Sequence, residues 1–395
     1  MVAAPTRKPE GRRAGTEPDA TTVNHYCTYF DRGFLIQGLA LWRSLARHDP
    51  AAVLWVLALD DATSVVLRRL GDARLRVVTL AELERDDPPL AAAKANRTRV
   101  EYFFTLSPCW PRWLLAHQPE IDRITYLDAD LCFFAPPAPV FSAMDAAGAS
   151  VLITPHRFSP WLSHYEQHGR FNVGILVFRG DATGRACLDD WRERCLAWCH
   201  DRVEDGRYAD QGYLDAWPER WGQALLVLDH PGVNLAPWNW MQHRLQAAAV
   251  PPGQDSPPSE PGSAGLTVDG CPVIVFHFAR FRPLDAAARW WQSGQLDYGI
   301  MPPRWREALY SPYLRALRAA RTELRALDPA IDFPRRAGRL GRDFWRALPL
   351  RLLFGGDWLR AGDRFFNLRF GLGRWSGRAL AIARKAFRRR IAPVA

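Results

Sequence analysis

Short apolar runs alternate with longer amphipathic stretches over the first three quarters of the chain. The runs predict strands at 23–30, 53–61, 74–80, 124–134, 149–156, 171–178 and around 266–278. The amphipathic stretches predict helices at 31–50, 64–72, 96–122, 181–201 and 209–221. Because Pro108 and Pro111 lie inside the third of these stretches, we expect that helix to be interrupted there.

Two of the apolar runs, 53–61 and 124–134, carry paired acidic residues toward their ends, which is typical of central strands that are covered on both faces. The pattern therefore predicts an α/β fold, an open sheet flanked by helices, with its ligand site at the carboxyl ends of the strands. We expect a disordered leader at 1–22 and one domain at 23–300. A stretch rich in Pro, Gly and Ser at 247–265 interrupts this domain as a mobile loop, and 301–395 forms a mostly helical, Arg-rich extension.

Composition excludes a chain that is disordered throughout, because 48% of the 395 residues are hydrophobic and only 24% are charged. The formal net charge of +10 is unevenly spread. Residues 335–395 contain fifteen Arg, one Lys and three Asp, a net charge of +13, so the rest of the chain carries −3. The basic character belongs to the C-terminal tail.

Three interpretations of this tail stay open, because its arginines are interleaved with Trp, Phe and Leu. It could lie on an anionic membrane surface, or pack its aromatic residues against the domain, and nucleic acid is a third and less favoured partner. No apolar stretch reaches the length of a membrane span. We therefore expect a cytoplasmic protein, peripheral to the inner face of the membrane if the first interpretation holds.

Seven scattered cysteines fit a reducing compartment, since a chain of this length does not need disulfides. Cys195, Cys199 and His200 form the tightest group. The further ligands of a structural zinc site are missing near them, so we expect these cysteines to pack as small apolar side chains.

The most specific chemical feature is the sequence Asp128-Ala129-Asp130 after an apolar strand. Two carboxylates at i and i+2 can face one hard cation, and Mg²⁺ or Mn²⁺ is typically held by one or two carboxylates together with substrate phosphates. His277, in a later strand, is a candidate third ligand. The alternatives are solvated turn acids and a hydrogen-bonded core histidine. Arg280 and Arg282 follow closely and could bind a diphosphate.

Five features in fixed order give the chain a family resemblance. They are an N-terminal β-α unit, LDAD after an apolar strand, FNVG in the next strand pair, ADQ at a short helix, and HF followed by basic residues. Over about residues 23–285 the chain resembles glycosyltransferases of the GT-A fold, and is similar to the family 8 group, which is glycogenin-like and retaining. The resemblance implies a GT-A-type open mixed sheet and a Mn²⁺ or Mg²⁺ cofactor.

The resemblance also assigns residues to the parts of a nucleotide-sugar site. Thr28, Tyr29 and Asp31 would cradle the nucleotide base. Asp128, Asp130 and His277 would bind the metal, and Asp128 would also contact the nucleotide sugar. Asn172 and Gly174 would line the sugar pocket, Arg280 and Arg282 would bind the diphosphate, and Asp210 and Gln211 would be catalytic, beneath the donor sugar.

Two departures from the family pattern matter. The usual Arg in Tyr-X-Arg-Leu is absent after Tyr102, and Lys94, Arg97 or Arg99 could supply its charge; we assign Arg99 to the nucleotide-sugar site. The family's Lys-Pro-Trp after the late His is Arg-Phe-Arg-Pro here. This change keeps the charge but leaves the nucleotide base undetermined.

The sequence thus predicts a metal-dependent glycosyltransferase that moves a sugar from a nucleotide-diphosphate sugar to a glycan or lipid-linked acceptor, with retention of configuration. In that reaction Asp210 or Gln211 would stabilise the cationic sugar, and a covalent route through Asp210 is a less favoured alternative. Two other classes remain open. One is a sugar-nucleotide nucleotidyltransferase, but the lack of a Gly-rich loop after the first strand argues against it. The other is a non-catalytic membrane-associated scaffold.

Overall fold

The structure, a computed structural model, describes residues 23–246, 265–283, 290–292, 298–299, 301–333 and 359–360. The predicted leader, the predicted low-complexity loop up to residue 264 and nearly all of the basic tail lie outside the described residues. Among the described residues, no helix is both long enough and apolar enough to cross a membrane.

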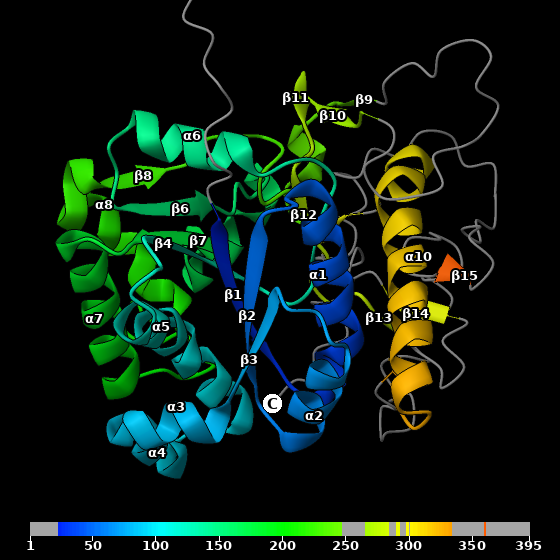
Figure 1. Cartoon of the computed structure of the whole chain (residues 1–395). Coiled ribbons are helices and arrows are strands. Elements are labelled where there is room, and N and C mark those ends of the chain that lie inside the picture. The colour runs from blue at the N-terminus through cyan, green and yellow to red at the C-terminus, as the bar shows by residue number, and fades with distance from the viewer. Residues whose placement is uncertain are drawn as a thin grey trace, which may run out of the picture.

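A seven-stranded sheet lies at the centre of the molecule, with strand order β3-β2-β1-β4-β7-β6-β8 (Figure 1). Its strands in chain order are β1 Asn24–Phe30, β2 Ala52–Ala58, β3 Leu75–Thr79, β4 Arg123–Leu127, β6 Val151–Pro155, β7 Phe171–Arg179 and β8 Leu225–Val227. β1 runs parallel to β2 and β4, whereas β7 is antiparallel to β4 and β6. The predicted open mixed sheet is confirmed.

Helices cover both faces of the sheet, which explains why β4 and β7 are buried almost throughout. One face packs against α1 Leu35–His48, α2 Asp61–Arg69, α6 Ala138–Ala146 and α10 Pro303–Leu327. The other packs against α3 Leu80–Asp86, α4 Pro88–Ala93, α5 Arg99–His117, α7 Ala182–Ala197 and α8 Trp217–Trp221. Figure 1 shows these two helical layers on either side of the strands.

The predicted interruption of α5 is wrong, because the helix runs through Pro108 and Pro111. Each proline removes one backbone hydrogen bond from a helix. Leu106, Trp110 and Leu114 of the same helix are fully buried. Burial of these large apolar side chains stabilises the helix enough to offset the two missing hydrogen bonds.

The helical character expected after residue 301 is confirmed for α10, which shares its core with the sheet. The ring of Tyr313 stacks on Phe278 with centroids 3.8 Å apart, and the ring of Phe333 meets Trp291 at 4.8 Å. Arg43 of α1 forms an ion pair with Glu323. The apolar face of α10 is therefore occupied by the domain itself.

Short elements complete the fold and bring distant segments together. A two-stranded sheet joins β5 Leu131–Phe133 to β12 Val275–His277. Further short strands are β9 Leu245–Gln246, β10 Thr267–Val268, β11 Cys271–Pro272, β13 Arg282–Pro283, β14 Trp290–Gln292 and β15 Leu359–Arg360. Short 3-10 helices are η1 Arg32–Phe34, η2 Lys94–Asn96, η3 Pro160–His168, η4 Gln211–Ala216, η5 Gly222–Ala224 and η6 Trp240–Gln242. The strand pair expected around 266–278 is present as β10 and β11, but β12 continues to β5 instead.

Candidate functional site

The turn after β4 carries Asp128 and Asp130, and two backbone contacts fix it. The amide of Asp128 donates to the Gly174 carbonyl of β7 at 2.9 Å, and the amide of Phe278 donates to the Asp130 carbonyl at 2.9 Å. In the β5 and β12 pair, His277 lies opposite Leu131. This pairing places an imidazole from the end of the domain beside two carboxylates from its middle.

Asp128, Asp130 and His277 can offer ligand atoms that all lie within 4.8 Å of one another. His277 Nε2 is 3.1 Å from Asp130 Oδ1 and 3.7 Å from Asp128 Oδ2. The two carboxylates are partly exposed and the imidazole is buried. Two carboxylate oxygens and one imidazole nitrogen, open to solvent on the carboxylate side, suit Mn²⁺ or Mg²⁺.

The electrostatics of this cluster favour a cation. Burial and the Asp130 carboxylate raise the pKa of Asp128, His277 and the Tyr126 hydroxyl oppose the shift, and the net pKa is about 6. Burial lowers the pKa of His277, but Asp130 and Asp128 outweigh it, so the net pKa is raised. One imidazole cannot neutralise two closely spaced carboxylates. A divalent ion bound between them would relieve the repulsion between the two negative charges.

Gly174 explains how the carboxamide of Asn172 and the ring of His277 come so close to β7. A Cβ on Gly174 would lie 2.6 Å from Asn172 Oδ1 and 2.8 Å from His277 Nδ1. Both distances are shorter than van der Waals contact. The absence of a side chain at Gly174 thus allows the side chains of Asn172 and His277 to approach β7 closely.

We expect Gly174→Ala to weaken Mn²⁺ binding about 10- to 100-fold, because His277 or its hydrogen-bond partner has to move. Isothermal titration with MnCl₂ measures the affinity. Gly184→Ala is the matched control, since its added methyl would strike the Arg179 backbone beside α7 instead. That control should lower the unfolding temperature and keep the Mn²⁺ affinity. Unchanged affinity in Gly174→Ala would contradict the metal assignment of His277.

Asp210 and Gln211 lie where η4 begins, and Asn172 links Gln211 to His277 of the cluster. Asp210 is buried. Burial and the Asp128 carboxylate raise the pKa of its carboxyl, a hydrogen bond with Ser107 opposes the shift, and the net pKa is about 7. Gln211 Nε2 donates to the carbonyl of His168 at 2.7 Å. Gln211 Oε1 accepts from Asn172 Nδ2 at 3.3 Å. The structure thus links the predicted sugar-facing residues to β7.

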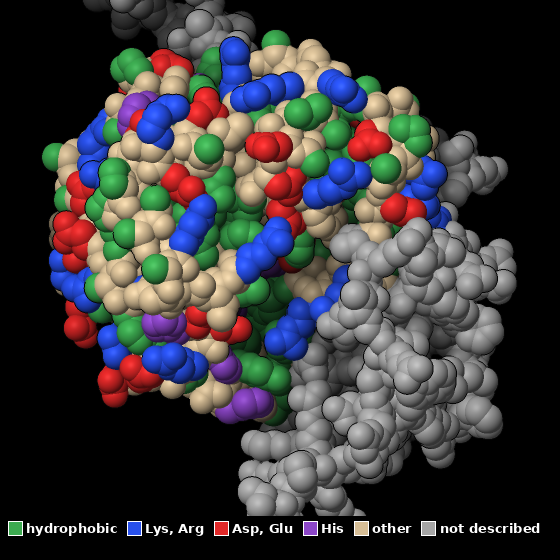
Figure 2. Space-filling model, turned by 90° about the horizontal axis from the view of Figure 1, so that it is seen from below, with side chains coloured by type: hydrophobic (Ala, Val, Ile, Leu, Met, Phe, Trp, Pro, Cys, Tyr) green, Lys and Arg blue, Asp and Glu red, His purple; other side chains and the backbone are tan. Residues whose placement is uncertain are grey.

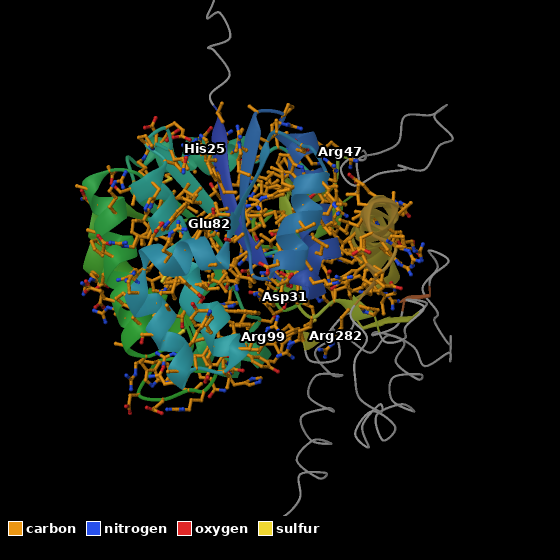
Figure 3. All side chains as sticks on the ribbon, turned by 60° about the horizontal axis from the view of Figure 1, so that its bottom comes forward. His25, Asp31, Arg47, Glu82, Arg99 and Arg282 are labelled. Atoms are coloured by element: carbon orange, nitrogen blue, oxygen red, sulfur yellow. The ribbon has the colours of Figure 1, made fainter. Side chains whose placement is uncertain are left out.

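The end of β1 leads to the same edge. Tyr29 is held by a hydrogen bond between its hydroxyl and Ser107 at 3.0 Å, and Thr28 is fully buried. Asp31 accepts from the Gly33 amide at 2.8 Å and from Arg99 Nη2 at 2.6 Å. Figure 3 shows Asp31, Arg99 and Arg282 at one end of the strands, opposite His25 at the start of β1.

The three candidate cations, two before α5 and one at its first position, have different partners. Lys94 pairs with Glu84, and Arg97 donates to the backbone oxygens at the end of α7, that of Leu196 at 3.1 Å. Arg99 is the one of the three that reaches Asp31 and remains mostly exposed, with 69% of its side chain accessible. The structure therefore favours Arg99 for the missing positive charge.

Arg280 and Arg282 follow His277 in the chain, just after β12. Arg280 has a positive φ of 64° and lies 5.7 Å from the ring centre of Tyr298, and Arg282 begins β13. Figure 2 looks onto this face and shows a hollow with basic side chains along its rim. The hollow is thus suited to an anionic ligand.

Two residues of the site were not predicted from the sequence. The Tyr126 hydroxyl donates to Asp128 Oδ1 at 3.0 Å, and His156 Nε2 lies 3.2 Å from Asn172 Nδ2. The strand alternation could have placed Tyr126, two residues before Asp128, on the same face. Nothing in the sequence near His156 connects it to β7.

No family model matches the chain. It is 33% identical over 266 residues to YfnF of Bacillus subtilis strain 168, an uncharacterised protein, covering 65% of this chain and 81% of YfnF. It is 29% identical over 260 residues to YfnD of the same organism, likewise uncharacterised, covering 65% and 78%.

Two solved structures similar to the chain are glycosyltransferases. The galactosyltransferase LgtC, in complex with donor and acceptor sugar analogues, is 15% identical with a TM-score of 0.44, covering 72% of this chain and 100% of LgtC. Mouse xyloside xylosyltransferase 1 is 17% identical with a TM-score of 0.37, covering 54% and 87%.

Proposed function

We propose that this chain, which belongs to the same protein family as YfnF of Bacillus subtilis, is a metal-dependent glycosyltransferase that uses a nucleotide-diphosphate sugar. The observation that carries the proposal is the cluster of Asp128, Asp130 and His277, whose ligand atoms lie within 4.8 Å of one another at the carboxyl edge of the sheet. Basic residues and a buried carboxyl group at the same edge suit the two halves of such a donor.

The metal cluster would receive the diphosphate of the donor. A bound Mn²⁺ or Mg²⁺ supplies positive charge to the departing diphosphate. Tyr126 donates to Asp128 Oδ1 and so orients that carboxylate, while Asp130 stays close to His277. Arg280 and Arg282 add fixed positive charge from the segment after β12, where negative charge develops as the glycosidic bond breaks.

The sugar would lie against Asp210 and Gln211. A carboxylate or amide oxygen below the ring stabilises the oxocarbenium-like sugar as the diphosphate leaves. Transfer with retention then requires the acceptor hydroxyl to arrive on the face that the diphosphate leaves. A covalent intermediate on Asp210 is the alternative route to retention, and the burial of this carboxyl makes it less exposed to water.

The nucleotide base would meet Asp31 and Arg99 at the exit of β1. The two side chains pair with each other at 2.6 Å, so a base could replace one partner of this ion pair. Tyr29, hydrogen-bonded to Ser107, and the fully buried Thr28 precede Asp31 on β1 and would support the base from within the domain. The base and the sugar themselves stay undetermined, as does the acceptor, a glycan or a lipid-linked sugar.

A panel of nucleotide sugars tests the proposal. We expect release of nucleoside diphosphate from at least one donor, dependent on Mn²⁺ or Mg²⁺ and abolished by EDTA. Release of pyrophosphate from a nucleoside triphosphate and a sugar phosphate would instead identify a nucleotidyltransferase. Binding of Mn²⁺ and nucleoside diphosphate without turnover on any donor would favour the non-catalytic scaffold.

A further inference from the structure

We propose that Asn172 is a positioning residue, which fixes the proton of His277 on Nδ1 and joins this metal ligand to Gln211 through one buried carboxamide. The effect of Asn172 on catalysis rests on the proposed function. The orientation of Asn172 and the position of the proton on His277 rest on hydrogen-bond geometry alone. It differs from the role that the family resemblance implies, which is direct contact between Asn172 and the donor sugar.

All the hydrogen-bonding capacity of the Asn172 side chain is already used within the protein. Oδ1 accepts from the Gly174 amide at 3.0 Å and lies 3.3 Å from His277 Nδ1. Nδ2 lies 3.2 Å from His156 Nε2 and 3.3 Å from Gln211 Oε1. A carboxamide has two acceptor positions and two donor hydrogens, so no position is left for a sugar hydroxyl.

The backbone decides which way the carboxamide faces. The amide of Gly174 can only donate, so the atom that meets it must be the oxygen of Asn172. His277 Nδ1 therefore faces an acceptor and must carry a proton. The lone pair of neutral His277 is then on Nε2, which is the nitrogen that faces Asp130 at 3.1 Å. This is the state in which imidazole binds a metal ion.

The other half of the carboxamide points toward the sugar-facing residue. With its oxygen fixed, Asn172 donates both Nδ2 hydrogens, one to His156 and one to Gln211. Gln211 is held from its other end by the carbonyl of His168. The side chain of Asn172 is only 6% exposed, so water competes little for these bonds. One residue thus sets the orientation of both a metal ligand and a predicted catalytic side chain.

Histidine ¹⁵N NMR on the wild-type protein tests the tautomer directly. In the metal-free protein at pH 9 we expect neutral His277 to carry its proton on Nδ1, whereas free neutral histidine favours a proton on Nε2. His277→Gln identifies the signals. A spectrum in which Nδ1 of neutral His277 lacks a proton would overturn the proposal, whether or not the protein transfers sugar.

Two substitutions separate the two halves of the carboxamide. Asn172→Leu removes both and should weaken Mn²⁺ binding about 10- to 100-fold. Asn172→Asp keeps the acceptor for His277 but loses the donor to Gln211. Its Mn²⁺ affinity should therefore fall no more than about threefold below that of the wild type, while its turnover should fall at least about tenfold. Isothermal titration with MnCl₂ and donor hydrolysis give the two readouts.

Val173→Ala is the control, since Val173 packs on the opposite face of the same strand. It should lower the unfolding temperature without changing Mn²⁺ affinity. If Asn172→Leu binds Mn²⁺ as tightly as the wild type, the positioning role is wrong and direct contact with the sugar is favoured. If wild-type protein shows the expected tautomer and Mn²⁺ affinity but no turnover, the proposed function fails and the positioning role stands.

Discussion

Asp130→Asn is expected to reduce Mn²⁺-dependent turnover at least about 100-fold, a loss of about 2.7 kcal/mol of transition-state stabilisation. The substitution keeps the size of the side chain but removes the negative charge that lies 3.1 Å from His277 Nε2. Asparagine offers one neutral oxygen in place of a carboxylate, so the metal is held more weakly. Initial rates of donor hydrolysis across a MnCl₂ series measure the loss.

Asp145→Asn is the matched control for this loss. Its carboxylate pairs with Arg123 at the start of β4 and with Arg179 at the end of β7, away from the candidate site. The control should keep wild-type turnover, because surface ion pairs contribute little. Turnover of Asp130→Asn within about threefold of the wild type at every Mn²⁺ concentration would show that Asp130 does not hold the metal.

The sequence predicted the sheet and the carboxylates well, because an apolar run that ends in acids is typical of a central strand whose carboxyl end reaches solvent. It did not predict how His277 reaches Asp130. The contact depends on β12 leaving β11 to pair with β5, and pairing between strands more than 140 residues apart has no local signal. The family resemblance supplied the histidine as a ligand, and the pairing supplies the physical reason.

Predictions from local sequence were wrong or incomplete where tertiary packing determines the structure. The rule that proline interrupts a helix is sound for Pro108 and Pro111 in isolation, but burial of the neighbouring apolar side chains of α5 overrides it. Similarly, Arg97 and Arg99 look equivalent in the sequence. Only the orientation of α5 against α7 shows that Arg97 is used within the protein, whereas Arg99 points to Asp31.

Asp210→Asn is expected to reduce turnover at least about 100-fold while leaving the affinity for nucleoside diphosphate within about threefold. The diphosphate lacks the sugar that this carboxyl would face, so only the step that builds charge on the sugar should suffer. Asp215→Asn is the control in the same η4 segment, because asparagine can still accept from the Arg170 amide, at 2.7 Å in the wild type. Equal losses of turnover and affinity would point to a misplaced site.

The same substitution should also change how stability depends on pH. Burial and the Asp128 carboxylate raise the pKa of Asp210 against a hydrogen bond from Ser107, to a net value of about 7. The folded protein therefore holds this proton to a higher pH than the unfolded chain, whose carboxyl titrates near 4. The contribution of Asp210 to the free energy of unfolding is therefore fully present below about pH 4 and is lost as the pH rises to about 7.

Removing the ionisable group should remove this loss. In EDTA-treated protein, the free energy of unfolding of Asp210→Asn relative to the wild type should increase between pH 5 and pH 8. Urea unfolding at several pH values measures the difference, with Asp145→Asn, which alters a half-exposed carboxylate, treated alongside. Because a carboxyl group open to water has no such penalty, a difference that stays constant from pH 5 to pH 8 would mean that Asp210 is solvated and does not form the buried floor of a sugar site.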